Sequence, residues 1–351
     1  MGEACRGGLP VSRSGVTGAS FNPLRILQLP AGCCYCASTL HPPGKARVVR
    51  KWVGWLLLLL GAFFLTTAAL TLFWAPGAAQ RTPLNVDTYT YLTGEADKLN
   101  PETGELETYP VKYTSHTQAD PDKSDGDYVA FVNTKCVNID ENDPAPCLEG
   151  TDERVITNSI DTFATDRHTA MATDKSKYLA DDAIPHEGLV NKWPFNAEKK
   201  TYPYWNGTLG ETVDANFVGT EEIDGLEVYR YDVKVDPTPA DVLPDTPGIY
   251  STNESIWIEP VTGSIINQSG GQVLKLADGT TILDINVAYT DETVATNVKD
   301  GKANSKQLKL ITKTVPPVAG LLGLLTLGAG ALVLLRGRRR TDESKATTTE
   351  S

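Results

Sequence analysis

Two long apolar segments constrain the fold of this chain more than any other feature of its sequence. The first covers Trp52–Trp74 and the second covers Val315–Leu335. A helix needs about 20 apolar residues to cross the hydrocarbon core of a bilayer, and each segment is long enough. The residues between them, 80–314, are polar and acidic. The sequence therefore predicts a membrane protein with two helical spans around one large water-exposed region.

Basic residues flank both segments on the sides that face the chain ends. They are Lys45, Arg47, Arg50 and Lys51 before the first segment, and Arg336, Arg338, Arg339 and Arg340 after the second. Lys and Arg near the end of a span favour the cytoplasmic side. We therefore expect a plasma-membrane protein with both termini in the cytoplasm and the central domain outside. The alternative is a signal peptide cleaved after Ala79, which would leave one span.

The predicted parts follow one another in a simple order. They are a cytoplasmic tail (residues 1–51), a first transmembrane helix (52–75), an extracytoplasmic domain (80–314), a second transmembrane helix (315–335) and a basic, then polar, cytoplasmic tail (336–351). The first tail holds four of the six cysteines and has no sustained periodicity. We expect it to be disordered, and a true start at Val48 or Val49 is favoured over a palmitoylated tail.

The charge of the chain is concentrated in the central domain. The formal net charge is −12, but residues 80–314 carry 20 basic and 40 acidic side chains. A surface of this sign repels phosphate backbones, so nucleic acid is excluded as a partner. Membrane lipid is expected to meet the two spans. The sequence predicts no particular oligomeric state.

The central domain shows the alternation and the turns that are typical of antiparallel hairpins. Gly225–Asp236 alternates apolar and polar residues. A turn at Pro260–Gly263 separates two strand-like runs, and Asp278-Gly279 does so within Gln272–Thr290. The turn LNPETG likewise separates two strand-like runs, Tyr89–Thr93 and Glu107–Tyr113. The predicted fold class is mainly β (α+β), an extracytoplasmic domain of antiparallel hairpins flanked by two transmembrane helices.

Helical patterns are scarce in this domain. The best candidates lie within Arg154–Ala172, with Ser159 or Asp161 as N-cap, and a second candidate is Asp291–Asn304. The second is too polar to bury a broad face. We therefore predict one or two short helices beside the sheet.

Cys136 and Cys147 are the only cysteines of the central domain, and a turn-rich stretch separates them. An oxidising exterior and an even count favour a disulfide that closes this loop, over two free thiols. In the chain-entropy model such a loop contributes roughly 2–3 kcal/mol.

Motifs that would indicate catalysis or a metal site are missing from the sequence. The four histidines show no HxxxH spacing, and neither a GxSxG elbow nor a phosphate-binding glycine loop occurs. Asp120, Asp122, Asp125 and Asp127 could be read as calcium ligands, but a solvated acidic turn is favoured. We therefore predict a protein that is not an enzyme and that needs no cofactor.

Aromatic residues are concentrated in Lys192–Asn206, which reads KWPFNAEKKTYPYWN. Flat rings of this kind can stack on sugars or line a lipid groove. The candidate ligand-binding residues are Trp193, Phe195, Tyr202, Tyr204 and Trp205. The alternative is that these rings pack in the hydrophobic core, within an irregular segment that crosses the domain.

The same aromatic stretch, followed by GLEVYRYDV and then SIWIEPVTGSII, resembles the actinobacterial membrane proteins that carry the domain of unknown function 3068, also named the porin PorA family. The resemblance covers residues 48–338. The family name implies a porin, whereas a transmembrane barrel has no helical anchors. Pore activity is therefore not transferred to this chain, and the resemblance supplies no catalytic residues.

These observations favour a membrane-anchored protein whose outer domain binds an envelope lipid, a glycan or a protein partner. The first alternative is a subunit of a channel or transport assembly, which would oligomerise through the glycine-bearing second segment. An envelope hydrolase built from residues distant in sequence is the least favoured alternative.

Overall fold

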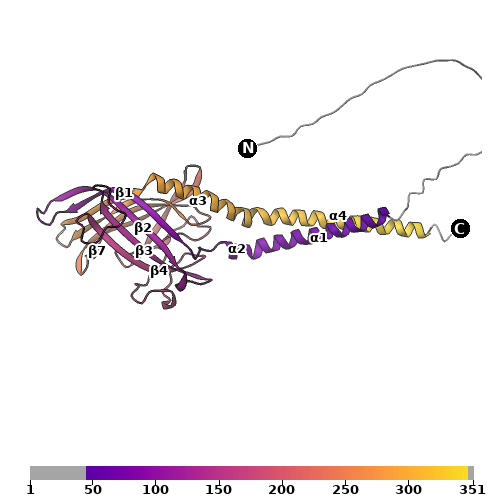
Figure 1. The fold of residues 1–351 in the computed structure, drawn as a ribbon, viewed down its shortest axis with the longest axis horizontal. Helices are drawn as coiled ribbons and strands as arrows, with labels where there is room; N and C mark the ends of the chain where they lie inside the picture. Colours follow the sequence, from indigo (N-terminus) through magenta and orange to yellow (C-terminus); the bar gives the residue numbers. More distant parts are fainter. Residues whose placement is uncertain (1–44, 347–351) are drawn as a thin grey trace, which may run out of the picture. The chain divides into compact units, whose positions relative to one another are not determined.

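The computed structural model describes residues 45–346, and both apolar segments are helical in it. Helix α1 (Lys45–Phe73) is followed by the short α2 (Ala75–Ala79), and α4 (Val315–Ala346) ends the described chain (Figure 1). Contacts divide the chain into residues 1–46 and a unit of residues 47–351, which contains all of the described strands. Most of the predicted N-terminal tail (residues 1–44) lies outside the described residues.

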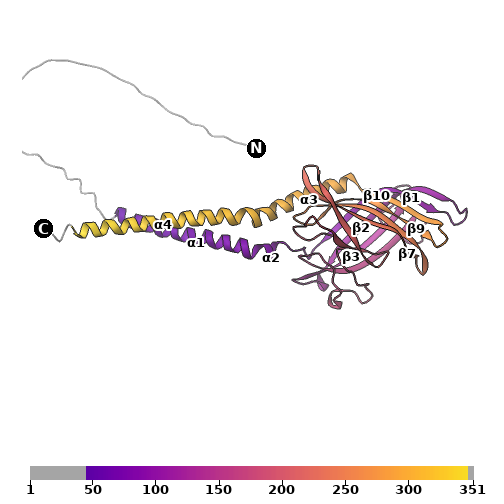
Figure 2. The same cartoon turned by 180° about the vertical axis from the view of Figure 1, so that it is seen from behind.

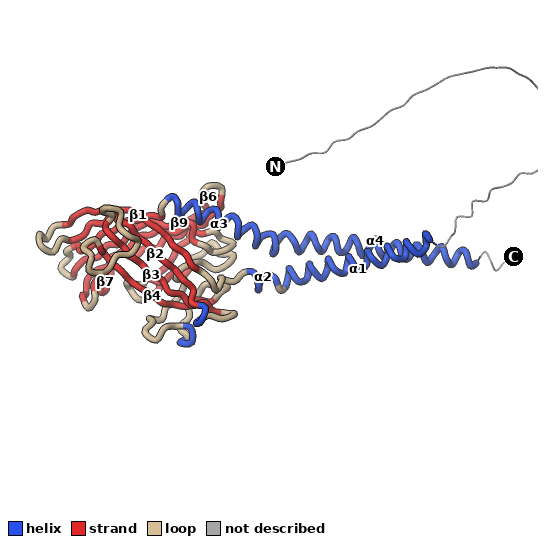
Figure 3. The backbone as a smooth tube through the Cα atoms, in the orientation of Figure 1, coloured by secondary structure: helices blue, strands red, loops and turns tan. Residues whose placement is uncertain are grey.

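A single antiparallel sheet forms the domain between the two long helices (Figure 3). Its order is β4-β3-β2-β1-β10-β9-β8-β7-β6-β5, so nearly every neighbour in the sheet is also a neighbour in sequence. The strands are β1 (Asp87–Leu99), β2 (Leu106–Asp120), β3 (Tyr128–Ile139), β4 (Val155–Asp166), β5 (Tyr202–Asn206), β6 (Glu211–Ile223), β7 (Leu226–Leu243), β8 (Thr246–Ile258), β9 (Ile265–Leu276) and β10 (Thr281–Tyr289). The prediction of a mainly β domain made of hairpins is confirmed.

The turns that the sequence indicated lie where the strands reverse. The turn LNPETG joins β1 to β2, Pro260–Gly263 lies between β8 and β9, and Asp278-Gly279 lies between β9 and β10. Gly104, Gly263 and Gly279 have positive φ values of 74°, 72° and 91°, which residues with a Cβ rarely adopt. The local turn chemistry thus fixes the hairpin register.

The helix expected within Arg154–Ala172 is wrong, because Val155–Asp166 is strand β4. Val155, Ile156, Thr157, Ile160 and Thr162 make this segment rich in β-branched residues, which favour strands. The apolar–polar alternation expected of a strand is hard to see in β4. One face of the strand carries the polar residues Ser159 and Asp161, which oppose Lys135 and Asn133 of β3. The helix at Asp291 is confirmed, and it extends further than predicted.

The sheet is curled (Figure 2), and the segment between its two edge strands, β4 and β5, pairs with both of them. We call this segment, residues 167–201, the strap. Ala172 of the strap pairs with Thr165 of β4, and Leu189 pairs with Met171 and with Tyr204 of β5. The Leu189 N–H donates to the carbonyl of Pro203 at 2.8 Å, and the Trp205 N–H donates to that of Leu189 at 2.7 Å. The strap therefore satisfies backbone groups at both sheet edges.

The chain leaves the sheet through one long helical run. Helix α3 (Asp291–Lys309) continues through a π-helical turn, η3 (Leu310–Thr314), into α4. Thr290 caps α3 by accepting a hydrogen bond from the Thr293 N–H at 3.2 Å. Val298 of α3 packs into a buried cluster with Leu226, Val228 and Ile266 of the sheet. Helix α3 is thereby held against one face of the sheet.

The two long helices contact one another through glycines. A Cβ on Gly61 of α1 would lie 2.6 Å from the side chain of Leu327, and one on Gly323 of α4 would lie 2.8 Å from that of Leu65. Other large apolar side chains of both helices are exposed within the described chain, including Leu59, Phe63, Leu321 and Leu324. Small residues at the contact and apolar residues elsewhere are what a bilayer requires of a pair of spans.

The predicted disulfide is confirmed. Cys136 and Cys147 are bonded, with their Cα atoms 5.3 Å apart. The bond ties the loop after β3 back to a buried position on that strand, because Cys136 is 2% exposed.

Candidate functional site

The concave face of the curled sheet is the candidate site, and hydrogen bonds between distant strands define it. Asn206 of β5 donates from Nδ2 to the Tyr250 hydroxyl of β8 at 3.0 Å, although three strand spacings separate β5 from β8. In a flat sheet this separation would be about 14 Å. The sheet must therefore curve toward the face that carries Asn206 and Tyr250.

Register then assigns further side chains to the same face. Tyr250, Thr252 and Glu254 alternate along β8. Gln272 and Gly270 lie opposite them on β9, and Ile285 and Val287 continue the row onto β10. The same face continues across β10, β1, β2 and β3. Leu92 of β1 lies between Tyr289 of β10 and Tyr113 of β2, and Lys135 of β3 lies opposite Ser115 of β2. The concave face is thus lined by tyrosines, amides, hydroxyls and a few charges in addition to apolar residues.

Burial acts on three tyrosines and one glutamate of this face, and also on Tyr231. Burial raises the pKa of the Tyr113, Tyr204 and Tyr289 phenols, and the charge of Glu254 raises each of them further. These residues come from β2, β5, β10 and β8, and the strand register places all four on the same face of the sheet. All four keep part of their surface accessible. At neutral pH the phenols are therefore uncharged and can both donate and accept hydrogen bonds.

Glu254 is held by polar neighbours. The Thr252 hydroxyl donates to Oε1 at 3.1 Å, and the Gln268 amide donates to Oε2 at 3.0 Å. Burial raises the pKa of the carboxyl group, while these hydrogen bonds and the charge of Lys135 oppose the rise only in part. A carboxyl group in this setting is poised to hydrogen-bond a polar ligand.

A histidine of the strap connects the two edge strands beside this face. His186 is 4% exposed, and its ring stacks on Phe163 of β4 at 5.4 Å and on Trp205 of β5 at 4.4 Å. Its Nε2 lies 3.1 Å from Asp161 and its Nδ1 lies 2.7 Å from the carbonyl oxygen of Ile184. Both neighbours are acceptors, so only the doubly protonated ring can donate to both.

Some buried polar atoms near this face have no hydrogen-bond partner within the described chain. Asn133 donates from Nδ2 to Ser115 and Thr117, but its Oδ1 is unpaired. The indole Nε1 of Trp193, a residue that is 0% exposed, is also unpaired. An unpaired buried polar atom costs about 1–3 kcal/mol, so a buried water is expected at the enclosed Trp193 indole and a water or ligand group at Asn133.

The five aromatic residues predicted to bind a ligand do not share one surface. Trp193 and Tyr202 are buried in a core cluster with Tyr231. Tyr204 packs against this cluster and lies on the same sheet face as Tyr202 and Glu254. Trp205 stacks on His186, and Phe195 lies under the ammonium group of Lys192 at 3.8 Å. Their role in binding stays a prediction.

Sequence reasoning missed the polar residues that line the concave face. Glu254, Tyr113 and Lys135 lie on three different strands, and each stands in an alternating run whose polar members are normally read as solvent-facing. A signal did exist in TNESIWI, where Glu254 shares its strand face with Ile256 and Ile258.

The acidic turn after β2 is occupied by internal partners. Asp120 accepts hydrogen bonds from the backbone of Asp122 and Lys123, and Asp125 binds Lys177 and the Tyr178 hydroxyl, each at 2.8 Å. Within residues 45–346 no group of three His, Cys, Asp or Glu residues is placed to hold a metal ion.

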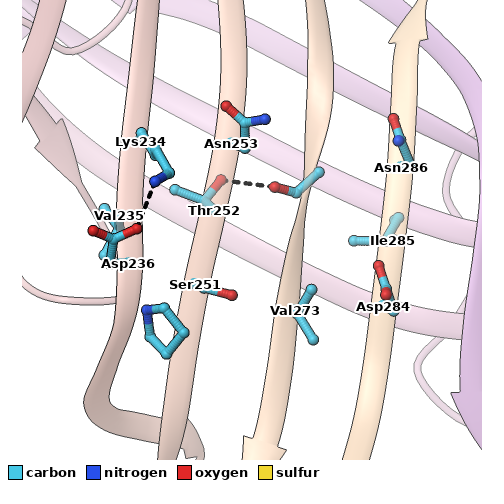
Figure 4. Close-up of a pocket in the computed structure, with 12 residues that line it drawn as sticks. Lys234, Val235, Asp236, Ser251, Thr252, Asn253, Val273, Asp284, Ile285 and Asn286 are labelled. Atoms are coloured by element: carbon cyan, nitrogen blue, oxygen red, sulfur yellow. Dashed lines mark hydrogen bonds and ion pairs between the residues drawn. The ribbon is translucent and has the colours of Figure 1, made fainter.

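A shallow recess of about 320 Å³ lies on the opposite, convex face (Figure 4). Lys234, Asn253, Gly271 and Asn286 form one row across β7, β8, β9 and β10 there. Lys234 is already paired with Asp236 at 2.7 Å. Thr252, which donates to Glu254, also contributes to the lining of the recess.

Comparison with known proteins agrees with this architecture. The family model described as Porin PorA matches residues 53–332, which run from the first span into the second. A Porin PorA of Corynebacterium amycolatum is 25% identical over a stretch that covers 36% of this chain and 34% of that protein. A Porin PorA of Corynebacterium resistens is 22% identical, covering 43% of this chain and 57% of the relative. The chain thus spans about a third to just over half of the length of these relatives. Because the family model covers most of the sequence, the chain belongs to the Porin PorA family.

Proposed function

We propose that the β domain is a non-enzymatic binding module that takes the hydroxyl-rich part of an envelope molecule, such as the sugar of a glycolipid, on its concave face. Support comes from the chemistry of that face. Neutral phenols at Tyr113, Tyr204 and Tyr289 can exchange hydrogen bonds with sugar hydroxyls. Their rings supply flat apolar area for the sugar carbons.

The polar lining of the concave face is the observation that carries this proposal. Tyr113, Tyr289 and Glu254 keep part of their surface accessible there, and the Asn133 carbonyl, which has no partner in the described chain, needs a donor. A hydroxyl group can donate to it, whereas a hydrocarbon chain cannot. A polar ligand therefore fits this face better than a purely apolar one.

The test is to purify the full-length protein from its own membrane in mild detergent and to identify the bound lipids by denaturing mass spectrometry. Tyr204→Phe removes one hydroxyl group, and Glu254→Gln keeps the size of the side chain while changing its charge. Both variants should retain several-fold less glycolipid than the wild type. The control is Tyr89→Phe, since Tyr89 is 52% exposed on the other face of the sheet. Wild-type protein without any co-purified glycolipid would refute the proposal.

We further propose that both chain ends lie in the cytoplasm and that the β domain lies outside the plasma membrane. Four basic residues lie at the end of each span that is nearer to a chain terminus, and they support this orientation. Protease added to intact cells should then digest the β domain and spare both ends. Protection of the β domain with loss of the ends would mean the opposite orientation.

A second candidate function is a subunit of a channel or transport assembly. The name of the relatives, Porin PorA, favours it, as does the glycine-rich α4. Purified protein in planar bilayers should then conduct ions and should crosslink as an oligomer. A monomer that gives no conductance would eliminate this alternative without affecting the binding proposal.

A further inference from the structure

Two cationic side chains contact Thr82 in the short connection between α2 and β1, and a third, Arg81, shares an acceptor with one of them. The Arg167 Nε donates to the Thr82 carbonyl at 2.7 Å, and Lys192 Nζ lies 3.3 Å from the Thr82 hydroxyl. Arg81 and Arg167 both donate to the carbonyl of Gly126, at 2.5 and 3.2 Å. The strap and the β2–β3 loop thus bring three positive charges together directly after the first span.

None of these cations has an ion-pair partner among residues 45–346. Each donates instead to uncharged oxygens, which leaves its charge uncompensated. The pKa of Arg167 is lowered by burial and by the positive charge of Arg81, against a smaller opposing effect of Asp125 and Asp127. Asp125 itself is bonded to Lys177. In a domain with twice as many acidic as basic residues, unpaired clustered cations require an explanation.

Lys192 is the most strongly affected of the three. Burial lowers the pKa of its ammonium group to about 7, and the group lies 3.8 Å from the centre of the Phe195 ring. A half-buried lysine without a carboxylate is stabilised in its charged form by an anion. The position that completes this cluster therefore suits a negatively charged group.

The cluster lies at the junction of the helices and the sheet. Helix α2 ends at Ala79, two residues before Arg81, and it contacts η3 of the other helical run. Lys306, Lys309 and Lys313 are exposed on α3 and η3 close to this contact. Basic residues therefore approach the ends of both spans, where lipid headgroups lie.

We propose that Arg81, Arg167 and Lys192 bind the phosphate group of an anionic phospholipid in the leaflet next to the β domain. Guanidinium groups match the geometry of phosphate oxygens, and a lysine adds a compact charge. The bound phosphate replaces the missing carboxylate partners and anchors the strap to the membrane surface. This inference is independent of what the concave face binds.

The experiment uses the full-length protein and counts retained lipids by native mass spectrometry after exchange into vesicles of phosphatidylglycerol and phosphatidylcholine. Arg81→Gln and Lys192→Gln should each lower retained phosphatidylglycerol about fivefold, the effect of one basic residue at an anionic surface. Lys234→Gln is the matched control, since this lysine is paired on the convex face, and it should leave retention unchanged. Arg167 is left intact because it also holds three backbone carbonyls.

Two outcomes would overturn the proposal. One is equal retention of phosphatidylglycerol by the wild type and both variants. The other combines two results: inorganic phosphate raises the melting temperature of delipidated protein in a way that depends on Arg81, and the protein shows no preference for phosphatidylglycerol over phosphatidylcholine. This outcome would assign the site to free phosphate. If Lys192→Gln does not fold, Arg81→Gln alone decides, because Arg81 is only partly buried and its Nε donates to the nearby Gly77 carbonyl of α2.

Discussion

Gly263 and Trp193 are joined through their backbones. The Trp193 N–H donates to the Gly263 carbonyl at 2.8 Å, and a Cβ on Gly263 would collide with the Trp193 carbonyl group. Gly263 also has a φ of 72°. The β8–β9 turn thus holds the strap in place at Trp193, the strap's single tryptophan.

Gly263→Ala should therefore destabilise the domain by more than the cost of its backbone conformation, which is about 1–2 kcal/mol. Gly104→Ala is the matched control, because Gly104 has a φ of 74° and open space around it. Thermal unfolding of both variants in detergent would measure the difference. Equal losses would mean that the turn and the strap are not in close contact.

Replacing Cys136 and Cys147 by alanine should lower the free energy of unfolding by about 2–3 kcal/mol, since the bond closes a short loop of the unfolded chain. Urea unfolding with and without reductant would measure this. Reductant should destabilise the wild type and leave the double variant unaffected. A double variant that still responds to reductant would mean that other cysteines dominate the effect.

The pair Asp161–His186 should make the strap sensitive to acid. Burial raises the pKa of Asp161. The hydrogen bond from His186, the charges of His186 and Lys135 and a backbone hydrogen bond from Thr162 together outweigh this effect, so that the pKa lies below its usual 3.8. A lowered folded-state pKa stabilises the protein above the unfolded pKa, and this stabilisation is lost as the pH falls through the folded value.

Wild-type protein should accordingly exceed Asp161→Asn in stability at neutral pH, and the difference should shrink below about pH 4. Unfolding measured from pH 2 to 7 would test this. The double variant with His186→Gln completes the cycle, and additive losses would show that the two residues do not interact.

Gly61→Leu and Gly323→Leu should separate the two spans. A Cβ added at either glycine would lie no more than 3.0 Å from a backbone nitrogen of the other helix. Gly328→Leu is the control, since open space surrounds that glycine. Thermal stability in detergent should fall for the first two variants only. A similar loss in all three would indicate an effect on insertion rather than on packing.

The sequence was sufficient for the spans, the disulfide and the hairpins with Gly turns, since each depends on local chemistry. It was misleading at Arg154–Ala172, because Ser159 and Asp161 face a polar concave side instead of an apolar core. The grouping of Tyr113, Tyr204, Glu254 and Tyr289 depends on how far the sheet curls, which no local pattern encodes. The strap was unpredictable for the same reason, since single-residue pairings hold it.

The uninterrupted helical run from α3 to α4 makes one of the two connections to the membrane stiff, whereas the other passes through the irregular residues after α2. Any change in the tilt of the second span is therefore passed as a lever movement to Val298 and the strands beneath it. The π-turn at Leu310–Thr314 departs from α-helical geometry, and kinks of long helices often occur at such turns, so it is the place where such a lever would bend.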